Sequence, residues 1–117
     1  MAKIYVAGKD INRAKRIIEI LKRNSHEITY DWPNFIEIGP TKEKAIREWE
    51  AVKSSELLVY LWEPGQESAR YEAGMAMGLG LPIIVSGNFT AFFFQLPNIH
   101  VVDSDEFISD KISEITH

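Results

Sequence analysis

The sequence contains no cysteine among its 117 residues. This absence excludes a disulfide framework, a thiolate metal site and a cysteine nucleophile, and it is compatible with a reducing cytosol. The formal net charge is only −4, so no overall basic field attracts nucleic acid. No segment approaches the roughly 20 apolar residues that a membrane-spanning helix needs, and the first ten residues lack the apolar run of a signal peptide. We therefore expect a cytoplasmic protein with neither a nucleic-acid nor a membrane partner.

Several common functional motifs are also missing. The turn "AGKD" lacks the GxGxxG of a dinucleotide fingerprint and the GxxxxGK[ST] of a P-loop, and no GxSxG elbow occurs. The three histidines, His26, His100 and His117, are scattered without metal-ligand spacing. The sequence therefore predicts no metal site and no cofactor. The turn that holds Gly8 and Lys9 fits either a plain tight turn or an anion site at a helix N-terminus.

The apolar residues of the chain alternate between two periodicities. Five apolar runs rich in β-branched residues predict strands at 3–8, 26–32, 56–62, 81–87 and 98–103. Four segments with helical spacing of apolar residues predict helices at 10–24, 41–55, 67–80 and 104–116. This alternation predicts a single α/β domain over residues 1–117: a three-layer sandwich with a five-stranded parallel sheet, flavodoxin-like or Rossmann-like. In such sheets ligands bind beyond the carboxyl ends of the strands.

Two carboxylates fall on the inward sides of predicted helices. Glu72 shares a helical stripe with Ala69, Ala76 and Leu79, so it is either a rim carboxylate favoured by the helix dipole or a buried acid with a polar partner. Glu48 leans toward the buried side of its helix, for which we expect Ile46, Trp49 and Val52 to face inward, or it is an ordinary flanking surface charge.

Tyr5 lies on the first predicted strand and faces opposite to Ile4 and Val6. A tyrosine in the core of a parallel sheet needs a partner for its hydroxyl, and a carboxylate above the strand end would provide one.

Two stretches, "KIYVAG" and "SSELLVYLWEPGQESARYEAGMAMGLGLPIIVSG", resemble the nucleoside 2-deoxyribosyltransferase family. That family includes the 2′-deoxynucleoside 5′-monophosphate N-hydrolases. The family pattern has a tyrosine and a glycine in strand one, and after strand three a glycine-rich loop followed by "YExGxAxxxGkP". Here the last element reads "YEAGMAMGLGLP", with Leu81 in place of the usual lysine. The resemblance extends from the first predicted strand to the fourth.

The resemblance implies an N-glycosidase or deoxyribosyltransferase that acts on 2′-deoxynucleosides or their 5′-monophosphates. Glu72 takes the place of the catalytic nucleophile and Tyr5 that of the tyrosine which holds it. Glu48 takes the place of a further acid that is usually aspartate. Lys9, after Gly8, stands where small and hydroxyl residues hold a phosphate in the phosphohydrolase relatives, and Asp10 beside it would repel one. Gln66 falls at about the place of a loop serine.

Other parts of the chain suggest how a substrate and a partner subunit would be held. Trp32 and Phe35 are candidates to stack on the base, or else they anchor their loop in the core. The resemblance implies a homodimer or higher homo-oligomer, and "FTAFFF" (89–94) is either an interface patch or packing under the last helix. The alternative function is a nucleotide-binding module of the same fold that has lost its catalytic activity. The short chain, Glu48 for aspartate and Asp10 favour this alternative.

Overall fold

A five-stranded, all-parallel sheet forms the centre of the molecule, as predicted. The computed structural model describes residues 1–36 and 39–116. The strands are β1 (Lys3–Ala7), β2 (Glu27–Ile28), β3 (Leu57–Leu61), β4 (Ile83–Ser86) and β5 (Ile99–Val102), in the order β2-β1-β3-β4-β5. This is an α/β, flavodoxin-like order. β1 and β3 are paired along their length, from Ile4 opposite Leu57 to Ala7 opposite Tyr60.

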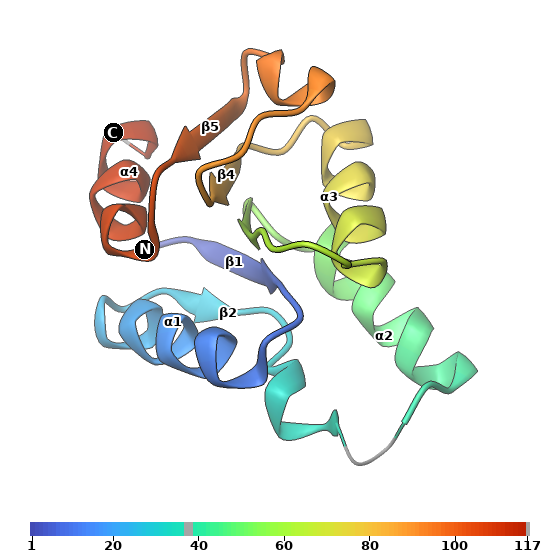
Figure 1. Ribbon diagram of the computed structural model, residues 1–117. Helices are drawn as coiled ribbons and strands as arrows, with labels where there is room; N and C mark the ends of the chain where they lie inside the picture. Colours follow the sequence, from blue (N-terminus) through green and yellow to red (C-terminus); the bar gives the residue numbers. More distant parts are fainter. Residues whose placement is uncertain (37–38, 117) are drawn as a thin grey trace.

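Helices cover both faces of the sheet (Figure 1). The helices α1 (Ile11–Arg23) and α4 (Ile108–Ile115) lie on one face, and α2 (Lys42–Lys53) and α3 (Ser68–Gly78) lie on the other. Short 3₁₀ turns occur at Trp32–Asn34, Phe92–Gln95 and Asp105–Phe107. The predicted three-layer sandwich is therefore confirmed.

Side chains and a glycine fix the helix ends. Asp10 caps α1, because its carboxylate accepts a hydrogen bond from the Arg13 amide at 3.1 Å. Thr41 caps α2 in the same way through the Lys44 amide. After α3, Gly80 has a φ of +74°, and the Leu81 amide donates to the Ala76 carbonyl at 3.0 Å. Glycine is the residue that tolerates this left-handed helix end most readily.

Two parts of the sequence prediction were wrong. The second strand is only two residues long, because the chain turns at Tyr30 toward a 3₁₀ turn whose Trp32 indole donates to the Val6 carbonyl at 2.7 Å. In α2, Val52 is buried as predicted, whereas Ile46 and Trp49 are 42% and 48% exposed. The reason is that the buried residues of α2, Ala51 and Val52, lie in its last turn, whereas its first turns project past the sheet (Figure 1).

Candidate active site

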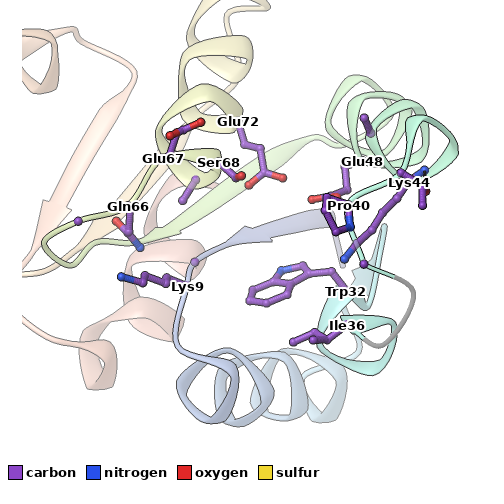
Figure 2. Close-up of a pocket in the computed structure, with 16 residues that line it drawn as sticks. Lys9, Trp32, Ile36, Pro40, Lys44, Glu48, Gln66, Glu67, Ser68 and Glu72 are labelled. Atoms are coloured by element: carbon purple, nitrogen blue, oxygen red, sulfur yellow. Dashed lines mark hydrogen bonds between the residues drawn. The ribbon is translucent and has the colours of Figure 1, made fainter.

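A cavity of about 570 Å³ opens at the carboxyl ends of β1 and β3, between α2 and α3. Its walls come from the ends of both strands, the 3₁₀ turn at Trp32, the described part of the loop before α2, and the first turns of α3 (Figure 2). Of the predicted site residues, six line the cavity directly: Gly8, Lys9, Trp32, Glu48, Gln66 and Glu72. The seventh, Tyr5, lies beneath it and contacts two of the others.

Tyr5, Glu48 and Glu72 form one hydrogen-bonded group. Tyr5 is fully buried in the sheet, and its hydroxyl donates to Glu72 Oε2. The same hydroxyl lies 3.2 Å from Glu48 Oε1. Figure 2 shows Glu72 from α3 and Glu48 from α2 pointing into the same cavity. Three residues from three separate elements therefore bring two carboxyl groups to one tyrosine hydroxyl.

Burial governs the protonation of this group. Glu72 is only 7% exposed, and this burial raises the pKa of its carboxyl to about 8. The hydrogen bond from Tyr5 acts in the opposite direction, while the nearby Glu48 carboxylate raises the pKa of Glu72 further. Burial, followed by the charge of Glu72, also raises the pKa of the Tyr5 hydroxyl. At pH 7 Glu72 is therefore mostly protonated in the free protein, and Tyr5 remains a hydrogen-bond donor.

Trp32 forms an apolar wall of the cavity. Its indole nitrogen is bound to the Val6 carbonyl, which fixes the ring beside the end of β1. Phe35, the other candidate for base stacking, instead stacks on Tyr30 with ring centroids 5.4 Å apart and does not line the cavity. A fixed, flat aromatic face next to two carboxyl groups is suited to a planar ligand.

The loop between β3 and α3 is held by Gln66. Its side-chain amide donates to the Leu61 carbonyl at 2.8 Å, and its side-chain oxygen accepts from the Glu63 amide at 3.0 Å. Gly65 has a φ of +76°, and a Cβ built there would lie 3.5 Å from Lys9 Nζ. Gln66 thus lines the cavity while its polar atoms bind the backbone, and the Lys9 amine lies at the rim beside Gly65.

The structure adds polar residues that the sequence reasoning missed. Ser68, the first residue of α3, lines the cavity, and its hydroxyl makes no hydrogen bond to any residue that the structure describes. Lys44 lines the opposite wall, on α2 (Figure 2). Ser68 could have been identified from its position, two residues after Gln66 and at the start of a predicted helix. For Lys44 the signal was its position one turn before Glu48.

The described residues contain neither a cluster of metal-binding side chains nor a membrane-spanning helix. Within residues 1–36 and 39–116, no group of three or more histidine or acidic side chains is placed to hold a metal ion. Over the same residues, no helix is long and apolar enough to cross a membrane. The chemistry of the cavity is that of carboxyl groups, a tyrosine hydroxyl and amines.

Comparison with known proteins supports the fold. No protein-family model matches the sequence, and no curated protein sequence matches it. Among solved structures, the chain is similar to the structure of Clostridium botulinum CMP N-glycosidase, BcmB, with a TM-score of 0.68 and 16% sequence identity. The match covers 96% of this chain and 98% of that chain. The two proteins thus share one fold over their whole lengths.

Proposed function

We propose that the protein cleaves or transfers the N-glycosidic bond of 2′-deoxynucleosides or their 5′-monophosphates, with Glu72 as the nucleophile. The observation that supports this most directly is the group of Tyr5, Glu48 and Glu72 in the cavity. Most enzymes that cleave glycosidic bonds use two carboxyl groups that flank the sugar. The shared fold with a CMP N-glycosidase and the "YEAGMAMGLGLP" pattern point in the same direction.

The protonation of the group suggests the order of events. Glu72 is mostly protonated in the free protein, so it loses a proton before it attacks. Glu48 is the proton acceptor next to Glu72, because the Tyr5 hydroxyl contacts both carboxyl groups. Glu72 then attacks C1′ as the C1′–N bond breaks, and Glu48 returns the proton to the departing base. The products are a free base and a sugar ester of Glu72.

The second half of the reaction releases the sugar. Water attacks C1′ of the ester while Glu48, now a carboxylate, takes the proton from that water. The C1′–Glu72 bond breaks, and the free sugar or sugar phosphate leaves. If a second base replaces water, the same step gives transfer. Trp32 would stack on the base, and Lys9 with the Ser68 hydroxyl would bind the 5′ end of the substrate.

Base release measured by liquid chromatography tests the proposal. The purified protein is incubated with each deoxynucleoside, each deoxynucleoside monophosphate and CMP, with and without a second free base. We expect release from at least one deoxy compound. Glu72→Gln should lower that rate by at least about a thousandfold, since a covalent nucleophile has no substitute. Glu50→Gln, on the exposed side of α2, is the matched control and should leave the rate unchanged.

Two results would count against this function. Unchanged turnover in Glu72→Gln would exclude Glu72 as the nucleophile. Calorimetry that detects nucleotide binding, together with no base release from any compound, would favour the nucleotide-binding module instead.

A further inference from the structure

A second cavity, of about 470 Å³, lies on the other side of the β3–α3 loop. It is bounded by the end of β3, by α3 and by the aromatic segment 89–94. Among the described residues the two cavities share only Gly65 and Gln66, and none of Tyr5, Glu48 and Glu72 lines the second one. Its volume is within the usual range for small-molecule sites, about 300–1,000 Å³.

A cluster of aromatic side chains lines part of this cavity. Trp62 and Phe89 stack at 4.0 Å between ring centroids, with their planes 10° apart. Phe94 meets Phe89 edge-on at 6.1 Å and Tyr60 edge-on at 6.3 Å. Phe93 also lines the cavity and is largely exposed. A flat aromatic ligand would meet both ring faces and ring edges here, which are the two favourable arrangements for aromatic pairs.

Two polar groups in this cavity have unused hydrogen-bonding capacity. Most of the Tyr60 side chain is buried, but its hydroxyl is accessible from the cavity and makes no hydrogen bond to any residue in the described ranges. A ligand in the cavity can therefore reach this hydroxyl. Arg70 donates from Nε to the Gln66 carbonyl at 2.9 Å, which leaves its terminal nitrogens without a partner among the described residues. Arg70 lies close enough to the Tyr60 hydroxyl to lower its pKa, against the effect of burial.

We propose that this second cavity binds a small planar aromatic anion, such as an aromatic carboxylate. The ring lies against the phenylalanine walls, and the carboxylate lies between the Tyr60 hydroxyl and the Arg70 guanidinium. The arginine fork matches a carboxylate geometrically, and the unpaired tyrosine hydroxyl can donate to the same anion. Glu63, the one acidic side chain among the described lining residues, lies 3.8 Å from Arg13 and is thereby partly neutralised.

The negative charge distinguishes the proposed ligand from another possible occupant, an aromatic side chain from a second copy of the protein. Such a side chain would fill the apolar part of the cavity and leave Tyr60 and Arg70 without an acceptor. A neutral pyrimidine such as uracil would have the ring but not the charge. Charge and ring are therefore both needed, and each can be removed separately in the ligand.

Titration by NMR or calorimetry tests this with benzoate as the probe. Cyclohexanecarboxylate lacks the aromatic ring, and benzamide and uracil lack the charge. We expect benzoate to bind with a dissociation constant in the millimolar range or tighter, as suits so small a ligand, and the other three to bind more weakly. Tyr60→Phe removes only the hydroxyl, and Arg70→Met removes the guanidinium from an exposed position. Each should weaken benzoate binding by about tenfold.

Glu72→Gln is the matched control, because it alters the first cavity alone and should leave benzoate binding unchanged. The proposal is therefore independent of the proposed function. It is overturned if benzoate does not bind at millimolar concentration, or if it binds Tyr60→Phe and Arg70→Met as tightly as it binds the wild type. It is also overturned if Glu72→Gln abolishes binding, or if binding appears only when the protein is diluted to a monomer, since a second copy would then occupy the cavity.

Discussion

Glu72 is a carboxyl group among small apolar side chains, and the helix dipole alone does not explain it. Glu72 is the fifth residue of α3, beyond the first turn, where the dipole has little effect. Its neighbours on the buried side include Ala69, Ala73 and Ala76. Burying a carboxylate in such a place costs several kcal/mol unless it is protonated or paired. The Tyr5 hydroxyl and the raised pKa of Glu72 together reduce that cost.

The raised pKa of Glu72 predicts that the protein loses stability as pH rises. Between the ordinary value of 4.5 and about 8, the folded protein binds more protons than the unfolded chain, so the free energy of unfolding falls across that range. Each pKa unit corresponds to about 1.4 kcal/mol, so the loss amounts to a few kcal/mol. Glu72→Gln, which cannot ionise, should lack this fall and be the more stable protein at pH 8.

Urea denaturation of both proteins at pH 5, 6.5 and 8 measures the effect. Glu67→Gln, at an exposed carboxyl next to α3, is the control and should follow the wild type. If the free energies of unfolding of the wild type and of Glu72→Gln change in parallel from pH 5 to pH 8, Glu72 is not a buried, protonated carboxyl.

At the scale of elements, Arg13 joins four segments that are far apart in the sequence. From α1 its guanidinium donates to the Trp62 carbonyl at 2.9 Å, to the Ser86 carbonyl at 3.0 Å and to both carboxylate oxygens of Asp105. Ser86 donates its hydroxyl to the same carboxylate at 2.6 Å. The ends of β3 and β4, and with them the loop that separates the two cavities, are thereby fixed to α1.

This network predicts that the free energy of unfolding depends on pH in acidic solution. Burial alone would raise the pKa of Asp105, but the hydrogen bonds from Arg13 and Ser86 outweigh it and hold the pKa below its ordinary value. The stabilisation is therefore present above about pH 4 and is lost as pH falls through the lowered pKa. Asp105→Asn should lose about 1–3 kcal/mol at pH 7.

Thermal denaturation between pH 7 and pH 2.5 checks this expectation. The difference between wild type and Asp105→Asn should shrink in the most acidic samples. Asp110→Asn, at an exposed position on α4, should cost little at any pH. A difference that stays constant down to pH 2.5 would show that the charge of Asp105 is not what stabilises the network.

The sequence predicted the five strands and the four α-helices that the structure describes. Their apolar residues recur at strand or helix spacing, and this spacing can be recognised within a short segment of sequence. It failed where burial depends on distant geometry. Ile46 and Trp49 have helical spacing, but nothing in their sequence shows that the first turns of α2 extend beyond the sheet. The second strand was overestimated for a similar reason, since Trp32 leaves the sheet to bind the Val6 carbonyl.

The centre of the candidate site was predicted better than its rim. The residues alone indicated that Tyr5 needs a carboxylate partner, and the resemblance implied that this partner is Glu72. In the structure the Tyr5 hydroxyl donates to Glu72. Ser68 and Lys44 were missed, because whether a polar residue near a helix start faces a cavity depends on how the loops before it run. The catalytic and binding roles of all these residues stay predictions.

At the scale of the whole molecule, one side bears a stripe of exposed apolar residues. Tyr71, Met75 and Leu79 follow each other at four-residue spacing on α3 and are 65%, 37% and 49% exposed. Trp49 is also exposed on α2, the helix that packs against α3. A row of apolar side chains on adjacent helices is typical of a surface that is covered in an assembly.

We therefore expect the protein to associate through the α2–α3 face, as its resemblance to a family of homo-oligomers also implies. Sedimentation velocity at micromolar concentration should show a mass of at least two chains. Met75→Glu places a charge at the centre of the stripe, where it would be desolvated without a partner, and should raise the dissociation constant by more than about tenfold. Ile20→Glu is the matched control, because Ile20 is similarly exposed but lies on α1, across the sheet. A wild-type protein that sediments as a single chain, or equal effects of the two substitutions, would show that this stripe is not the contact surface.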